Sequence, residues 1–311
     1  MKLFPRMELA VKALALCCEN KDDGKTRCGD AEKSPIARSE VFNETWMLRL
    51  TLAAIHDYGE GFCHLDGKKN DALKRIQEAV QKRWISEGGL EPAFEKEGTT
   101  WTDAILGNVR LKGESGDNNK KKDTASNKRK VEFADTPNNK PSVIIVEAKM
   151  GSPLDKSVTN STDYDQAARN IACLAKLLNE GTKNAKALAV ESAFIVFAPE
   201  TKIEEWEADN NKADNNPHTM IRNAWSTIEK QQEERKRDSK RGGIINARES
   251  AVERIGDLES LVQSICHNSN VISWEDIIQS MKNDKSGACE ILKWFYVKTC
   301  KEYGIKVGEL K

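Results

Sequence analysis

Two short apolar runs, rich in β-branched and aromatic residues, stand out in a largely polar chain at positions 143–146 and 193–198. Short runs of this kind, bounded by Pro and Ser, are typical of strands that are buried on both faces. They predict strands over 143–149 and 192–198, and the second strand ends at Pro199. Because a helical segment separates the two strands, we expect them to be parallel neighbours.

A third strand-like run covers 101–111 and precedes the first of these strands along the chain. We expect the two to pair as an antiparallel hairpin, with position 111 opposite position 141. This register places Asp103 opposite Lys149, and cross-strand neighbours lie about 5 Å apart. Glu147 projects from the same strand face as Lys149. The pattern therefore predicts that Asp103, Glu147 and Lys149 share one patch of the sheet.

Apolar residues spaced three or four apart predict helices over most of the remaining chain. We expect one helix over 39–58, capped by Ser39, and a second over 71–87, ended by Gly88 and Gly89. A third lies between the strands at 163–178, with its cap at position 161, 162 or 163. In the last expected helix, the aromatic residues at 294–296 are predicted to fill the core. The other expected helices cover 1–18, 219–241, 246–266, 273–281 and 289–303.

These elements divide the chain into three parts. Residues 1–38 form an N-terminal helix and loop, residues 39–200 form an α/β core with a mixed central β-sheet flanked by helices, and residues 201–311 form a mostly helical C-terminal part. Residues 112–140 are almost free of apolar side chains and predict a disordered hairpin insertion, in which 131–133 could extend the hairpin. The basic clusters at 120–122 and 128–130 either contact a nucleic-acid backbone or belong to a solvated loop.

The charge balance does not favour a nucleic-acid partner, because 49 Lys and Arg residues offset 49 Asp and Glu residues in the 311-residue chain. The eight cysteines form no Cys-x-x-Cys pair, which argues against a zinc site or a disulfide framework. No run reaches the roughly 18 apolar residues of a membrane span. An apolar stretch near the N-terminus is interrupted by Glu8 and Lys12, which indicates a helix and not a signal peptide. The composition predicts a soluble, cytoplasmic protein without a membrane partner.

The strand at 143–149 carries charge where its apolar pattern predicts burial. A carboxylate and an ammonium group at such a position are costly unless they are paired, hydrated or bound to a metal ion. An ion pair between Glu147 and Lys149 at the strand end is one explanation. Glu44 is another acid at an expected core position, because it lies within the apolar stripe of the helix over 39–58. Its carboxylate either points toward the same site or favours the helix dipole.

The order of these motifs is similar to that of a known enzyme superfamily. Asp103, the Glu147-Ala148-Lys149 strand and the helix that opens with Asp163-Tyr164-Asp165-Gln166 resemble the core of the PD-(D/E)XK nucleases, which include many restriction and repair endonucleases. The resemblance covers about 39–199. The chain departs from the pattern in having Thr102 where the superfamily has proline, and in a long insertion between Asp103 and Glu147.

The resemblance implies a restriction-endonuclease-like fold and a metal-dependent site. Asp103 and Glu147 would bind Mg²⁺, for which Mn²⁺ can substitute, and hard oxygen ligands suit both ions. The carbonyl group of Ala148 and the carboxylate of Glu44 would be further ligands.

The resemblance also implies roles for two more side chains. Lys149 would position or deprotonate the attacking water and offset developing charge, and Gln166 would orient the lysine or contact DNA. The expected function is therefore metal-dependent hydrolysis of phosphodiester bonds, in DNA because the superfamily acts mostly on DNA. Two other classes stay open. The chain could be an inactive nuclease-fold module that binds nucleic acid or serves in an assembly, or an unrelated α/β protein whose helical C-terminal part associates with other chains, for example as a homodimer.

Overall fold

The computed structural model describes most of the expected core of the chain. The described residues are 9, 41–58, 62, 65–94, 97–113, 129–134, 141–155, 164–181, 190–208, 216–241, 259–281, 287–307 and 310. The expected N-terminal helix and loop, most of the insertion at 112–140 and the first half of the helix expected over 246–266 lie outside them.

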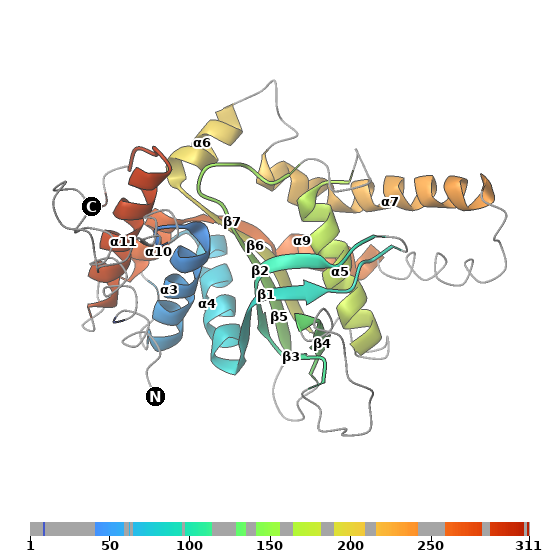
Figure 1. Cartoon of the computed structure of the whole chain (residues 1–311), viewed down its shortest axis with the longest axis horizontal. Helices are drawn as coiled ribbons and strands as arrows, with labels where there is room; N and C mark the ends of the chain where they lie inside the picture. The colour runs from blue at the N-terminus through green and yellow to red at the C-terminus, as the bar shows by residue number, and fades with distance from the viewer. Residues whose placement is uncertain are drawn as a thin grey trace, which may run out of the picture.

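A five-stranded sheet runs through the centre of the described residues (Figure 1). Its order is β1 (Trp84–Leu90), β2 (Thr100–Gly107), β5 (Ser142–Ala148), β6 (Glu191–Ala198) and β7 (Asn270–Ser273). β1, β2 and β5 are antiparallel neighbours, whereas β5, β6 and β7 are parallel neighbours. The predicted α/β class with a mixed central sheet is confirmed, and so is the parallel pairing of β5 with β6.

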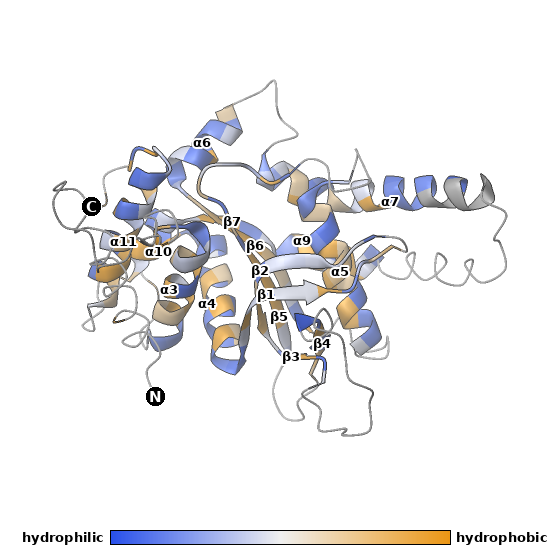
Figure 2. Ribbon diagram, in the orientation of Figure 1, coloured by the Kyte–Doolittle hydropathy of each residue, from blue (hydrophilic) through white to orange (hydrophobic). Residues whose placement is uncertain are grey.

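Helices cover both faces of the sheet and enclose two apolar clusters (Figure 1). On one face lie α3 (Glu44–Asp57), α4 (Gly67–Lys82), α10 (Trp274–Ser280) and α11 (Ala288–Glu302), and on the other lie α5 (Gln166–Gly181), α7 (Pro217–Arg241) and α9 (Glu259–Asn268). The short helix α6 (Glu200–Ala208) follows β6 directly. Alternate residues of β5 enter the two clusters, with Ile144 in one and Ile145 in the other. Figure 2 shows the apolar strands at the centre and helices whose polar residues face outward.

The second predicted helix begins four residues earlier and ends five residues earlier than expected, because its last predicted residues form a strand. α4 ends at Lys82, and the following Arg83 is extended. Residues from Trp84 onward pair with β2, so hydrogen bonds to the neighbouring strand outweigh the helical spacing of the apolar residues. Gly88 does not stop a helix but lies inside β1, where a Cβ atom would come within 2.9 Å of the Ile105 side chain.

The strand predicted over 101–111 is broken in two. β2 ends at Gly107, and β3 (Val109–Leu111) pairs with β4 (Val131–Phe133) in a separate two-stranded sheet. Residues 131–133 thus form a strand beyond the β2–β5 pair, but the predicted pairing of position 111 with position 141 is wrong, because Leu111 pairs with Val131. Gly107 has a φ of 102°, and a Cβ atom there would come within 2.0 Å of the Ser142 carbonyl oxygen. Asn108 then bonds back to β5, donating its N–H to the Ser142 oxygen at 2.7 Å and accepting the Ser142 N–H at 2.8 Å.

This break changes the predicted register between β2 and β5 by two residues. Ala104 pairs with Val146, so the same register continued by one residue puts Asp103 across from Glu147 and not across from Lys149. Side chains alternate between faces with a period of two, and a shift of two therefore leaves the predicted faces of β5 unchanged.

The predictions at the two ends of the core also need correction. α3 begins at Glu44, and its cap is Asn43, whose side chain accepts the Trp46 N–H at 3.0 Å; the predicted cap, Ser39, lies outside the described residues. β7 was not predicted, and it adds a strand from the C-terminal part to the central sheet. The helix expected after it is confirmed as α10, and the prediction that 294–296 fills the core holds for Phe295 and Tyr296, which are fully buried.

Candidate functional site

The candidate site lies where β5 ends. Glu147 is 4% exposed, and its neighbour Ala148 is the last residue of the strand. The N–H of Lys149 donates to the Phe197 carbonyl at 2.8 Å, which ties the strand end to β6. The Lys149 ammonium then lies 3.2 Å from Oε1 of Glu147. The strand-end ion pair considered from the sequence is therefore present in the structure.

Asp103 joins this pair from β2. Its Oδ2 accepts the backbone N–H of Ala148 at 2.8 Å. The structure thus brings Asp103, Glu147 and Lys149 together as predicted, although by a different register. The role of the Ala148 carbonyl group as a metal ligand stays a prediction.

Gln166 is held in the site by the first turn of α5. Asp165 caps this helix, accepting the Ala168 N–H at 2.8 Å, and the predicted cap positions 161–163 lie outside the described residues. The Gln166 side chain accepts the Asp155 N–H at 3.2 Å and donates to Oε1 of Glu147 at 2.5 Å. Gln166 therefore orients the carboxylate of Glu147, whereas the resemblance implied contact with the lysine or with DNA.

Glu44 approaches from the opposite side of the sheet, as the first residue of α3. Its Oε1 accepts the N–H of Met150 at 2.6 Å, which satisfies a backbone donor just beyond the strand. The Glu44 carboxylate therefore points to the strand end, as one of the two readings of the sequence required. We call Glu44, Asp103, Glu147 and Lys149 the carboxylate–lysine cluster.

Burial and mutual charge set the protonation of this cluster. Burial raises the pKa of Glu147 to about 8, and the nearby Asp103 carboxylate acts in the same direction. Burial also raises the pKa of Asp103 and of Glu44, against the hydrogen bonds that each accepts from a backbone N–H. Burial alone would lower the pKa of Lys149, but the carboxylates of Glu147, Asp103 and Glu44 outweigh it, and the pKa is raised. Lys149 is therefore a cation at neutral pH.

One oxygen of Glu147 bears on whether the cluster suits a metal ion. Oε2 is buried and has no hydrogen-bond partner among the described residues, whereas Oε1 is shared by Lys149 and Gln166. A buried carboxylate oxygen in this state is open to a hard cation, and Asp103 lies on the neighbouring strand, where its charge raises the pKa of Glu147. Glu147 and Asp103 thus fit a Mg²⁺ ion. Within the described part of the chain, however, no three His, Cys, Asp or Glu side chains are gathered closely enough to form a three-ligand metal site.

Two residues near the cluster were not predicted. Tyr303, which follows α11, has its hydroxyl group beside Glu44, and burial together with the Glu44 carboxylate raises its pKa. Glu87 in β1 carries a φ of 56°, which is strained for a residue other than glycine, and its charge contributes to the raised pKa of Asp103. Glu87 was assigned to a helix end and Tyr303 lies far along the chain, so neither carried a signal in the sequence.

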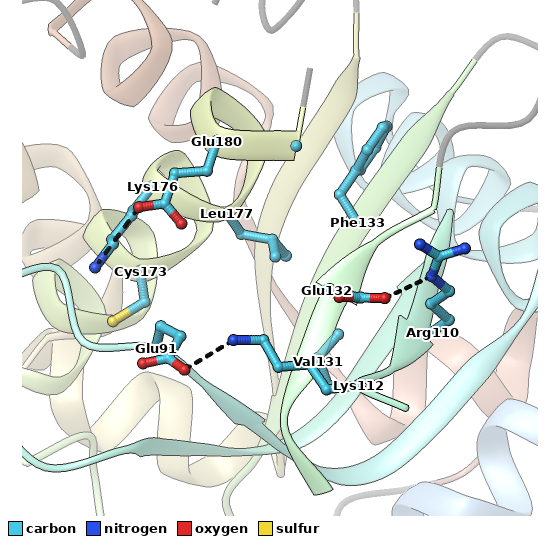
Figure 3. A pocket seen from close by; sticks show the side chains of 11 residues that line it. Glu91, Arg110, Lys112, Val131, Glu132, Phe133, Cys173, Lys176, Leu177 and Glu180 are labelled. Carbon is cyan, nitrogen blue, oxygen red and sulfur yellow. Dashed lines mark hydrogen bonds and ion pairs between the residues drawn. The ribbon is translucent and has the colours of Figure 1, made fainter. Parts of the chain in front are cut away.

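A pocket of about 250 Å³ lies away from the cluster, between the C-terminal half of α5 and the β3–β4 hairpin (Figure 3). Its charges are balanced internally, since Arg110 lies 2.7 Å from Glu132 and Lys112 lies 3.0 Å from Glu91.

Comparison of the chain with protein families, with curated proteins and with solved structures finds no significant match. Among the described residues, no helix is both long enough and apolar enough to cross a membrane.

Proposed function

We propose that the protein is a metal-dependent nuclease with a restriction-endonuclease-like core, and that it hydrolyses phosphodiester bonds in DNA. The observation that carries the proposal is the state of Glu147. One of its oxygens is held by Lys149 and Gln166, and the other is buried and open to a cation beside Asp103. The resemblance of the motif order to PD-(D/E)XK nucleases supports the same function.

Phosphodiester hydrolysis requires an activated water molecule and stabilisation of the negative charge that develops on phosphate. A divalent ion held by Asp103 and Glu147 would supply both when bound. The protein's own residues perform the rest. Gln166 fixes the orientation of Glu147, and the Lys149 cation offsets charge in the transition state. Lys149 also lies where it would position the attacking water or remove its proton, as the resemblance implies.

Glu44 has a smaller part in this mechanism. One of its oxygens already accepts the Met150 N–H, so Glu44 fixes the chain just after Lys149. It would act as an additional ligand only through its other oxygen.

Cleavage of four substrates tests the proposal directly. Purified protein is incubated with linear and circular double-stranded DNA, single-stranded DNA and RNA, in Mg²⁺ or Mn²⁺. We expect cleavage that EDTA stops and that Lys149→Ala abolishes. Lys176→Ala is the matched control, because Lys176 lies on α5 and pairs with Glu180 at 3.8 Å. Cleavage that survives in Lys149→Ala would contradict the proposed site.

A catalytically inactive module of the same fold, serving in nucleic-acid binding or assembly, is the second candidate. It is favoured by the lack, among the described residues, of three metal-ligating side chains gathered at one point. Calorimetric titration with Mn²⁺ separates the two candidates. Binding that Glu147→Gln removes supports the nuclease, and the lack of any binding together with the lack of cleavage supports the inactive module.

A further inference from the structure

Two exposed aromatic side chains lie beside the carboxylate–lysine cluster. Trp101 is 50% exposed and Tyr303 is 41% exposed. In the described part of the chain the other exposed large apolar side chains are aliphatic, namely Leu9 and Val297. An exposed aromatic ring offers a flat face on which a nucleic-acid base stacks.

Trp101 lies two residues before Asp103 on β2. Its partner on β1 is Gly89, which has no side chain to cover the ring. The ring lies close over this glycine, with its Cζ3 atom 3.2 Å from the position that a Gly89 Cβ would take. The sheet therefore supports the indole next to the cluster and leaves it open to a ligand.

Tyr303 lies against a second glycine, two residues after Lys149. The ring atom Cδ1 is 3.3 Å from the position that a Gly151 Cβ would take. Its hydroxyl group is beside Glu44, and the ring is 41% exposed. One open ring thus lies beside Asp103 on β2, and the other, far along the chain, lies beside Glu44.

Two arginines carry positive charge beside β1, where both pair with Glu87. Arg49 and Arg129 each lie 3.3 Å from the Glu87 carboxylate, and the Arg129 carbonyl is 3.4 Å from the same Gly89 Cβ position that the Trp101 ring approaches. Exposed ion pairs of this kind contribute only about 0–1 kcal/mol, so a phosphate group can compete with Glu87 for the guanidinium groups. Aromatic rings with neighbouring cations are the usual means of binding single-stranded nucleic acid without sequence preference.

We propose that the site takes single-stranded or locally unpaired polynucleotide, with one base stacked on Trp101, another on Tyr303, and a phosphate at the carboxylate–lysine cluster. This inference rests on the proposed function, and it specifies the form of its substrate. A fully paired duplex does not satisfy it, because its bases are stacked on one another and cannot reach the rings.

The test is a binding measurement in EDTA, where no metal-dependent cleavage occurs. Fluorescence anisotropy is recorded with labelled dT20, with a blunt duplex of the same length, and with a strand of the same length made of abasic sites. We expect Trp101→Ala and Tyr303→Ala each to weaken binding of dT20 by about 5- to 150-fold, which corresponds to the roughly 1–3 kcal/mol of one base stacked on an aromatic ring. Binding of the duplex and of the abasic strand should change less than twofold.

Trp101→Phe keeps a ring and should retain most of the affinity for dT20, which separates stacking from a loss of folding. Val297→Ala, the truncation of an exposed side chain on α11, is the control and should have no effect. Equal losses on dT20, duplex and abasic strand would overturn the inference, as would unchanged binding of dT20 or no binding of it by the wild type.

The outcome is independent of the cleavage test. If the wild type cleaves nucleic acid but Trp101→Ala does not change the preference for single strands, the proposed nuclease function is supported and this inference is wrong. Ring-dependent binding of dT20 without cleavage by the wild type removes the nuclease and leaves a binding site for single strands.

Discussion

Glu147 and Glu275 are both buried glutamates, at 4% and 2% exposure, but their surroundings differ. Glu275 lies on α10, and both of its oxygens accept a hydrogen bond, from the Tyr296 hydroxyl at 2.5 Å and from the Glu200 N–H at 2.9 Å. Glu147 shares one oxygen between two donors, and the other has no partner among the described residues. Burial raises the pKa of both carboxyl groups.

The difference separates a structural acid from a candidate functional one. Glu275 connects α10 to the start of α6 and to α11, and its hydrogen bonds compensate for its burial. Glu147 is buried at similar depth without full compensation, so the fold holds it there at a cost. Buried polar atoms without partners are uncommon in folded proteins, and they are expected where a ligand completes them.

The largest expected effect is on cleavage. Glu147→Gln preserves the shape of the side chain but removes the charge that a metal ion requires, and we expect the rate in Mg²⁺ to fall by about 1000-fold or more. Glu275→Gln is the matched change at the other buried acid, and its rate should stay within about twofold of the wild type. Equal losses in the two variants would remove the distinction between the two glutamates.

The second expected effect is on the free energy of unfolding, where substitution of Glu275 should cost more than substitution of Glu147. Glu275→Ala removes the carboxylate that accepts from the buried Tyr296 hydroxyl and from the Glu200 N–H, so we expect the free energy of unfolding to fall by about 3 kcal/mol. Glu147→Ala should cost about 1 kcal/mol or less, because it also removes a poorly compensated buried carboxyl group. Urea denaturation followed by circular dichroism measures both. A larger loss for Glu147→Ala would show that its carboxylate is structural.

The pH dependence of the free energy of unfolding should also identify Glu147 as the poorly compensated acid. Burial raises the pKa of Glu147 from 4.5 to about 8, so between these pH values the folded protein binds more protons than the unfolded chain. Stability contributed by Glu147 is therefore lost as the pH rises from about 4.5 to about 8, by on the order of a few kcal/mol at most.

Urea denaturation in EDTA across this pH range, with Glu147→Gln beside the wild type, isolates the effect, because the other buried acids titrate in both proteins. We expect the wild type to lose more stability than the variant as the pH rises. Mg²⁺ should reduce that loss in the wild type, since it binds the ionised carboxylate. Parallel curves for the two proteins would contradict the raised pKa of Glu147.

The smallest expected effect concerns Gln166. Its side chain donates to Glu147 but does not carry charge, so Gln166→Ala should lower the cleavage rate by about tenfold through poorer orientation of the carboxylate. Gln263→Ala is the control, because Gln263 contacts Glu259 on the exposed surface of α9. A loss for Gln166→Ala as large as that for Glu147→Gln would assign Gln166 a direct part in the chemistry.

The two central strands could be predicted because their own residue pattern identifies them as strands. β5 and β6 are apolar on both faces, and only a buried strand suits such short runs. The helical crossover that joins them then makes them parallel. The proximity of Asp103 to Glu147 could also be predicted, because a two-residue error in register leaves each side chain of β5 on the same face of the sheet.

Other elements depend on neighbours that the local pattern does not contain. Trp84 follows Val80 at a spacing that suits a helix, and pairing with β2 makes it part of a strand. β7 has only four residues, too few for a period to appear, and it is a strand because β6 lies beside it. Residues at the end of one element are most open to such tertiary control, because their own hydrogen bonds are incomplete.

By itself, the sequence determined the α/β class, the buried strand that carries Glu147 and leads into Lys149, and the presence of an acid on the preceding strand. These follow from side-chain periodicity and from the cost of burying charge, which are local properties. Only the tertiary structure decided the surroundings of the site: Gln166 on Glu147, Glu44 on the Met150 N–H, and the open rings of Trp101 and Tyr303 over glycines. Those contacts join residues far apart in the chain, and they exist only once the helices have packed on the sheet.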